Sequence, residues 1–309
     1  MSIRKIRRLL TEVFSEWQLN EVSLLASSLA YYTVFSLAPL MVLVIMIVGT
    51  IYGEAAVQEE LVSQLSQIFG EEGAELIGTA IANLRVDPGQ RTWQILFNIG
   101  FVIFGATGVF TQIQAALDRI WEVKPTPGRG VFNLFRKRLL SFLMVLGVAF
   151  ILVLFFVGNT LLARLVIILN ELVPGSGYLW QIMSLLITFT GTTLIFIMMY
   201  SMLPDAEIAW RDTIVGAIIT TLLFLVGQYF FGLFLGQTDF GSAYGVAGSF
   251  VIVITWIFYA AHILFLGAEF TKVYAKQRGA AIVPSEYAVH ISEEEQHNPS
   301  SSEKKRHRR

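Results

Sequence analysis

Long apolar segments alternate with short polar connections along this chain of 309 residues. A helix that crosses the hydrocarbon core of a bilayer needs about 20 mostly apolar residues. Six segments reach that length, with ends placed to within a few residues: 29–52, 94–115, 139–163, 180–203, 213–236 and 247–274. Strands of a membrane β-barrel would instead be short and alternate in polarity. The pattern predicts an all-α integral membrane protein whose domain at 29–274 is a bundle of six spanning helices.

The basic residues favour one side of these spans. Lys and Arg are retained in the cytoplasmic loops of membrane proteins. When the connections are taken alternately and Lys272 is counted with the C-terminal segment, one side holds nineteen of the 22 basic residues and the other side holds three. This excess predicts that both termini lie in the cytoplasm.

Two amphipathic segments lie outside the spans. In residues 1–28, apolar side chains recur at helical spacing between basic ones: Ile3, Ile6, Leu10, Val13, Phe14 and Trp17. This spacing predicts a cytoplasmic helix that lies in the membrane interface, either as an anchor or as a gate or lipid sensor. The first external loop has two helical patterns around Gly70-Glu71-Glu72-Gly73, which predict an acidic helical hairpin at about 54–86. The hairpin would be a cap or a lid over the outer mouth of the bundle.

Composition sharpens the class of protein. Apolar residues make up 55% of the chain and charged residues only 15%, whereas a soluble domain carries about 25% charged residues. A water-soluble fold is therefore excluded. The segment 279–309 is polar and ends in basic residues, so it cannot bury enough apolar surface to order itself. It is predicted to be a disordered cytoplasmic tail that meets anionic membrane lipids rather than nucleic acid.

Several strongly polar side chains fall inside the predicted spans. Such a side chain costs several kcal/mol in hydrocarbon unless it finds a partner, so it is expected to face the interior of the bundle. The candidates for a polar pathway are Asn98, Gln112, Gln228, Thr255, Tyr259, His262 and Glu269. In the first span, Pro39 removes a backbone donor and predicts a kink.

The last span carries four of these candidates at offsets of four, three and seven residues, which places Thr255, Tyr259, His262 and Glu269 on one helical face. One hypothesis is a proton or cation relay, because histidine titrates near neutral pH. The alternative is a buried neutral histidine that is bonded to another helix.

Motifs for enzymatic chemistry are missing from the sequence. The chain has no cysteine, and three of its four histidines lie in the C-terminal tail, so we expect no metal site. No phosphate-binding glycine motif precedes a helix, so we expect no cofactor and no catalytic activity. Asp118 and Glu122 flank Arg119 and are interpreted as a salt-bridge cluster at the interface.

Four stretches occur in a specific order along the chain: Leu29-Ala30-Tyr31-Tyr32 with Ser36-Leu37-Ala38-Pro39-Leu40; Ile113-Gln114-Ala115-Ala116-Leu117-Asp118-Arg119-Ile120-Trp121; Leu203-Pro204-Asp205 with Trp210-Arg211-Asp212 and Gly216-Ala217; and Tyr244-Gly245 with Gly248-Ser249, Trp256, Tyr259 and Gly267-Ala268-Glu269. Together they resemble the YihY/BrkB family of bacterial inner-membrane proteins, over about residues 10–278. The resemblance implies a six-span protein of the bacterial cytoplasmic membrane. Members have been labelled ribonuclease BN, which conflicts with the residues present here, and transport or lipid translocation has been suggested for relatives. Asp118 departs from the asparagine that is common in the family.

The leading hypothesis is a secondary transporter or flippase-like permease that moves a small solute, ion or amphiphile without ATP hydrolysis. Six spans are few for a transporter, and a homo-oligomer would supply the missing bulk. The alternative is a non-transporting membrane scaffold or envelope-integrity protein, in which the polar residues only lock helices together. A pocket that reaches His262 would favour transport, and a dry core would favour the scaffold.

Overall fold

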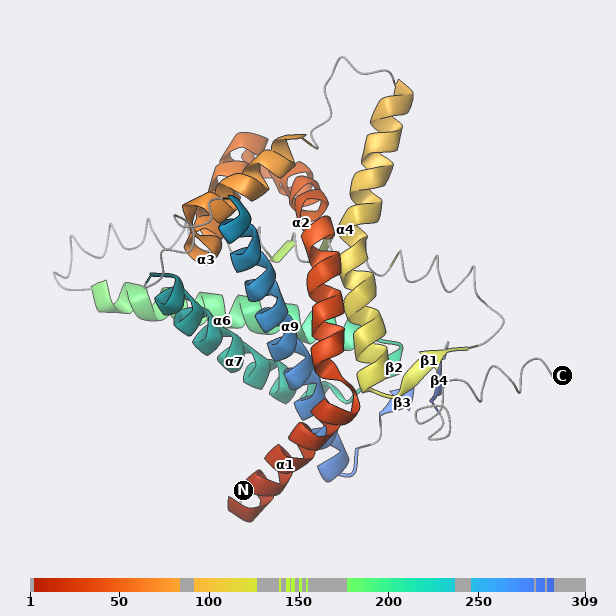
Figure 1. The fold of residues 1–309 in the computed structure, drawn as a ribbon. Coiled ribbons are helices and arrows are strands. Elements are labelled where there is room, and N and C mark those ends of the chain that lie inside the picture. The colour runs from red at the N-terminus through yellow and green to blue at the C-terminus, as the bar shows by residue number, and fades with distance from the viewer. Residues whose placement is uncertain are drawn as a thin grey trace.

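The computed structural model describes residues 3–83, 92–126, 177–236 and 246–291 apart from 281 and 287, together with single residues between 139 and 154. Most of these residues are helical (Figure 1). The helices are α1 (Ile3–Leu19), α2 (Val22–Tyr52), α3 (Glu54–Asn83), α4 (Thr92–Ile120), α6 (Gly177–Met202), α7 (Trp210–Gly236) and α9 (Val246–Gln277). The strands are β1 (Val123–Pro125), β2 (Ala206–Glu207), β3 (Val283–Pro284) and β4 (Ala288–His290).

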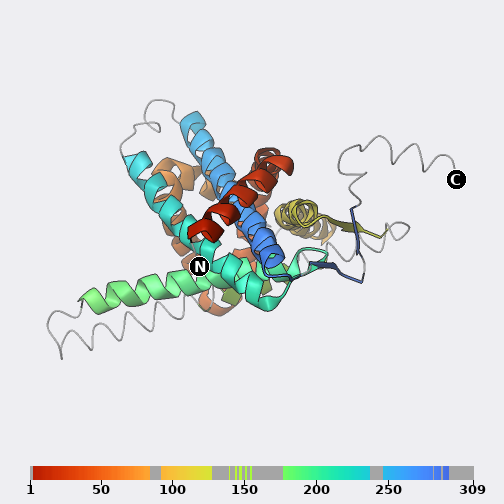
Figure 2. The same cartoon turned by 90° about the horizontal axis from the view of Figure 1, so that it is seen from below.

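Helices α2 and α9 form the centre of the fold. Helix α2 packs against α4, α3 and α9, and helix α9 packs in turn against α7, α3 and α1. Helix α6 packs on α7, and Figure 2 shows its N-terminal half extending away from the other helices. The largest buried core follows from this arrangement, because it collects side chains from α2, α3, α4, α6 and α9.

Within the described residues, five helices are long and apolar enough to cross a membrane. They are Val22–Thr50, Gly100–Ile120, Ile182–Met202, Trp210–Phe234 and Phe250–Gln277. These helices coincide with five of the six predicted spans. The sixth, predicted at 139–163, lies almost entirely outside the described residues.

The boundary predicted at residue 28 between the N-terminal helix and the first span is wrong. Helix α1 ends at Leu19, and α2 already begins at Val22. The break between them falls at Glu21, which has a left-handed backbone with φ of 52°. Hydropathy misplaced the boundary because the first turns of α2 mix serine with apolar residues and still continue the helix.

Helices α2 and α4 approach each other closely where α4 carries glycines. A Cβ atom on Gly105 would lie 2.8 Å from Cγ of Pro39, and one on Gly108 would lie 2.8 Å from Oγ of Ser36. Small residues at such contacts let two helix backbones come together inside a membrane. Pro39 lies inside α2 without ending it, and the kink expected there stays a prediction.

The segment after the first span is a single run of helical residues, α3, that doubles back on itself. A straight helix would separate residues 62 and 78 by about 24 Å, at about 1.5 Å per residue. Instead, a Cβ atom on Gly78 would lie 3.8 Å from Cγ2 of Val62. Figure 1 shows α3 folded beside the C-terminal end of α2 and the N-terminal end of α9. Its external side, and its role as a cap or a lid, stay predictions.

The expectation that the chain is disordered from residue 279 onward is wrong for the two C-terminal strands. Strand β4 pairs antiparallel with β1 after α4, and β3 pairs antiparallel with β2 after α6. Beyond the ladders, the amide of Ile291 donates to the Glu122 carbonyl at 2.8 Å. Composition misses this order because the partners that satisfy the backbone groups lie elsewhere in the chain. Residues 292–309 lie outside the described residues.

Candidate functional site

His262 projects from α9 toward the start of α2. Its Nδ1 lies 3.0 Å from the carbonyl oxygen of Phe258, which can only accept a hydrogen bond, so we assign Nδ1 as the donor. Its Nε2 lies 3.2 Å from Oγ of Ser23 and, with Nδ1 as the donor, accepts a hydrogen bond from the Ser23 hydroxyl. The imidazole packs against the rings of Phe258 and Trp17, at centroid distances of 4.3 and 6.2 Å. The imidazole therefore bonds to another helix from a half-buried position, and the choice between a relay and a buried neutral histidine stays open.

Glu269 lies two turns further along α9 and is completely buried. Its Oε1 accepts a hydrogen bond from Nδ2 of Asn20 at 2.7 Å. Its Oε2 has no hydrogen-bond partner in the part of the chain that the structure describes. Since Asn20 sits at the turn between α1 and α2, this contact ties the last helix to the break between the first two.

Lys272 follows Glu269 by one turn and is shared by two acids. Its Nζ donates to Oε2 of Glu16 at 2.8 Å and to Oε1 of Glu122 at 2.7 Å. Glu16 belongs to α1, and Glu122 follows α4 with a left-handed backbone of φ 60°. We call these groups, Glu16, Asn20, Glu122, Glu269 and Lys272, the inner acidic cluster. It joins α1, α4 and α9 at one end of the bundle.

The salt-bridge cluster predicted around Arg119 stays a prediction, because most of the basic loop that belongs to it lies outside the described residues. Oδ1 of Asp118 accepts a hydrogen bond from the backbone amide of Asp205 at 2.7 Å. Arg119 pairs with Glu21 at 2.8 Å, and Glu122 pairs with Lys272. Arg119 and Glu122 thus each form an ion pair with a distant segment of the chain.

The four polar residues of α9 do not share one buried surface. Thr255 is exposed, and Tyr259, which is 40% exposed, lies over Gly227 of α7. His262 and Glu269 contact α1 and α2 instead. The expectation that all four side chains face the interior of the bundle is therefore wrong. Residue spacing sets the direction of a side chain around the helix axis, but it does not set which other helix packs there at each height along α9.

The remaining candidates are spread over other helices. Gln112 donates from Nε2 to Oγ of Ser28 at 2.8 Å and so links α4 to α2. Gln228 is half-buried in α7. Asn98 falls within α4, but its side chain lies outside the described part of the structure. Of the seven predicted pathway residues, the structure thus brings His262 and Glu269 to the same side of α9 and leaves Gln112 in a separate contact.

Some residues of the site were not predicted from the sequence. Ser23 and Asn20 look like ordinary polar residues near a helix end, and only the fold places them against α9. Lys272 had a signal, since a lysine one turn after a glutamate inside an apolar span needs partners. Gln114 is also fully buried, and neither of its side-chain polar atoms has a partner among the described residues.

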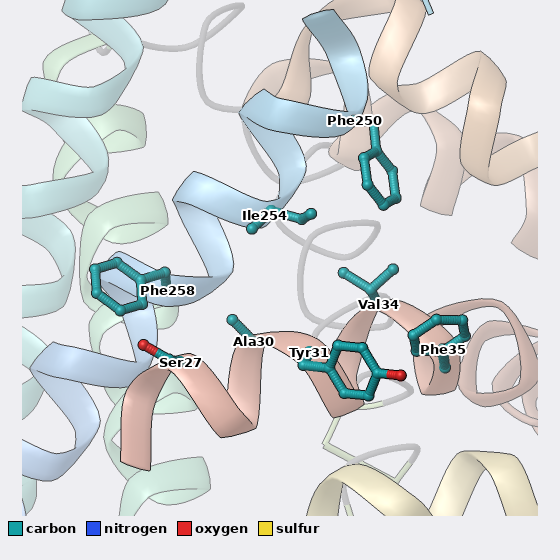
Figure 3. A pocket seen from close by; sticks show the side chains of 8 residues that line it. All are labelled: Ser27, Ala30, Tyr31, Val34, Phe35, Phe250, Ile254 and Phe258. Carbon is teal, nitrogen blue, oxygen red and sulfur yellow. The ribbon is translucent and has the colours of Figure 1, made fainter. Parts of the chain in front are cut away.

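A groove of about 370 Å³ lies between α2 and α9 (Figure 3). Its lining is almost entirely apolar: Ser27, Ala30, Tyr31, Val34 and Phe35 from α2, and Phe250, Ile254 and Phe258 from α9. Figure 3 shows Ser27 and Phe258 together at one end and Phe250 near Phe35 at the other. The Ser27 hydroxyl donates to the Ser23 carbonyl at 2.8 Å, so this end of the groove adjoins the Ser23–His262 pair.

Comparison with known protein families decides the affiliation of the chain. A family described as "Virulence factor BrkB" matches residues 13–289. The chain belongs to the BrkB family. The match covers α2, α4, α9 and strands β1 to β3 of the structure, and it ends within β4.

Relatives of this BrkB-family chain are described as UPF0761 membrane proteins. One from Pseudoalteromonas translucida is 26% identical over 82% of this chain and 81% of its own length. One from Vibrio parahaemolyticus is 26% identical over 84% of this chain and 79% of its own length. The chain spans only 44% of a 25% identical relative from Psychrobacter. No solved structure matches the chain. The relatives' descriptions name a membrane protein and no activity.

Proposed function

We propose that this chain is a flippase-like permease of the bacterial cytoplasmic membrane, and that it takes an acyl chain of an amphiphile into the groove between α2 and α9. The groove is the observation that supports the proposal. Its volume of about 370 Å³ falls in the range of small-molecule sites, about 300–1,000 Å³. Its walls belong to two helices of membrane-spanning length.

The lining of the groove selects hydrocarbon over polar solutes. Apart from Ser27 and the phenol of Tyr31, every wall side chain is apolar. An ion or sugar placed there would lose its hydration without gaining hydrogen bonds, at a cost of several kcal/mol. An acyl chain would instead bury apolar surface against phenylalanine and isoleucine. The occupant that fits this chemistry is the tail of a lipid.

The polar end of the groove suits the headgroup of the same molecule. Ser27 lines this end, and the Ser23–His262 pair follows within one turn of α2. A phosphate or ester oxygen would take hydrogen bonds from these hydroxyl and imidazole groups in exchange for the bonds that they now make within the protein. An amphiphile would therefore lie with its tail in the groove and its headgroup beside His262.

Blocking the groove tests this proposal. Val34→Trp places a large ring in the groove from a half-buried position, while Leu24→Trp places the same ring on the exposed side of α2. We expect purified wild-type protein to speed the movement of a fluorescent phospholipid across proteoliposomes. Val34→Trp should reduce that rate to the level of protein-free vesicles, and Leu24→Trp should retain it.

Two outcomes would contradict the permease. The first is a wild-type protein that moves lipid no faster than empty vesicles do, which would favour the scaffold. The second is equal loss in Val34→Trp and Leu24→Trp, since the groove would then have no specific part in lipid movement. No catalytic reaction is part of the proposal.

A further inference from the structure

The inner acidic cluster has three carboxyl groups and one cation among its five members. Its carboxyl groups are Glu16, Glu122 and Glu269, and Lys272 is the cation among its members. Lys272 donates to Glu16 and Glu122, so its two observed bonds are both used on acids other than Glu269. Among the described residues, Glu269 accepts a hydrogen bond from the neutral amide of Asn20 alone.

The three acids differ sharply in their access to water. The side chain of Glu16 is 22% exposed and that of Glu122 is 40% exposed, so both can keep a charge partly hydrated. Glu269 is 0% exposed, and its Oε2 has no partner within the described residues. An isolated carboxylate without water or a bonded cation costs far more than a neutral carboxyl with one open hydrogen bond, which costs about 1–3 kcal/mol. The neutral form therefore suits this position.

We propose that Glu269 is a proton-binding site that couples proton movement to the permease. The coupling rests on the proposed function. The proton-binding site does not, because it follows from a buried carboxyl group with only one of its two oxygens hydrogen-bonded among the described residues. The sequence has no phosphate-binding motif for ATP. The movement of protons across the membrane can drive transport without ATP hydrolysis.

The surroundings of Glu269 suggest how binding would change the structure. The charged groups that act on it are Lys272 on its own helix, Glu16 of α1 and Glu122 after α4. When Glu269 loses its proton, its carboxylate competes for Lys272 one turn away, because side chains three residues apart on a helix are neighbours. Lys272 then loosens its bond to Glu16 or Glu122 and releases α1 or the end of α4.

Two other titratable groups lie near the cluster and take no part in this exchange. Glu21 is bonded to Arg119 at the surface, so that pair is already neutralised. His262 faces Ser23 and the carbonyl of Phe258, two turns away along α9 and about 10 Å from Glu269 by the rise of the helix.

Infrared spectroscopy of the full chain in lipid nanodiscs tests the site without any transport. We expect an absorption band of a protonated carboxyl group at neutral pH that Glu269→Gln removes and that the matched variant Glu16→Gln retains. If Glu269→Gln does not fold, Glu269→Asp is expected to shift the band rather than remove it. The proposal is overturned if wild type and Glu269→Gln give the same carboxyl spectrum, or if sodium ions at constant pH abolish the band.

A second measurement tests the coupling. In proteoliposomes, a pH gradient should accelerate lipid movement by the wild type, whereas the rate of Glu269→Gln should be the same with and without the gradient. Val34→Trp separates the two proposals, because it should lose lipid movement and keep the infrared band. A band without lipid movement in the wild type would reject the permease alone, and lipid movement without the band would reject the proton site alone.

Discussion

Gly267 illustrates how a single residue is constrained where three helices meet. Tyr200 of α6 donates its hydroxyl to the Leu264 carbonyl at 2.6 Å and lies 3.0 Å from Oγ1 of Thr220 in α7. Both side chains are fully buried and cross directly over Gly267 of α9. A Cβ atom on Gly267 would collide with Thr220 and would lie 2.6 Å from the Tyr200 oxygen. The buried hydrogen bonds depend on the absence of that one atom.

Gly267→Ala is therefore expected to destabilise the protein by about 1–3 kcal/mol, the usual cost of overpacking a core. The matched control is Gly191→Ala in α6, where an added Cβ atom would have no neighbour within 4 Å. Alanine there should be neutral or stabilising by up to about 1 kcal/mol, because it is the better helix former. Thermal unfolding in detergent measures the stability of both variants against the wild type. Similar melting temperatures for the two variants would refute the close contact.

At the scale of elements, α1 divides its apolar residues between two surroundings. Leu9 and Val13 are buried against Val273 of α9, whereas Leu10 and Phe14 are 59% and 57% exposed. The sequence predicted the amphipathic helix but assigned all its apolar residues to one surface and omitted Leu9. Helix α1 packs on α9 through Leu9 and Val13. Leu10 and Phe14 remain exposed, and their contact with the membrane interface stays a prediction.

A disulfide cross-link tests this docking, because the chain has no cysteine of its own. Leu9→Cys with Val273→Cys should cross-link, and Leu10→Cys with Val273→Cys should not. Hydrogen bonds from Gln277 and Arg8 hold the pKa of Glu12 below the ordinary glutamate value. The hydrogen bond from Gln277 of α9 to Glu12 of α1 therefore stabilises the folded protein above about pH 4.3, and this stabilisation is lost as the pH falls through the lowered pKa of Glu12. Thermal unfolding of the wild type should show this loss at acidic pH. Equal cross-linking of the two pairs would contradict the docking.

At the scale of the whole molecule, α2 and α9 are the partners of α1, α3, α4 and α7, whereas α6 packs on α7. They frame the groove, and the inner acidic cluster lies at the end of α9 where α1 and α4 also arrive. The C-terminal strands close the same end by pairing with the segments that follow α4 and α6. The groove and the acidic cluster thus lie along one helix pair, so a movement of α9 against α2 would alter both.

The orientation of the molecule can be tested with single cysteines. Ser2→Cys and Ser300→Cys should resist a membrane-impermeant thiol reagent in intact spheroplasts and react after lysis, since the basic residues predict cytoplasmic termini. Glu59→Cys, at an exposed position of α3, should react before lysis. Labelling of either terminus before lysis would overturn the orientation and place α3 in the cytoplasm.

The accuracy of prediction differed between residues for physical reasons. The apolar runs 29–52 and 94–115 predict spanning helices, because the bilayer sets the same requirement of length and polarity for each segment. The groove had no such signal, since its lining residues look like any lipid-facing residues. The partner of Glu269 was equally hidden, because Asn20 is 249 positions away in the chain.

The amino-acid order by itself determined that the chain has helices long and apolar enough to cross a membrane, where five of them lie, and that the last of them carries ionisable groups. Each of these properties is local, since hydrocarbon acts on every stretch of 20 residues in the same way. Only the tertiary structure decided which neighbour each polar group meets. It separated Tyr259 from Glu269, gave Lys272 two acids, and ordered strands β3 and β4. These outcomes depend on contacts between distant segments, which no local pattern records.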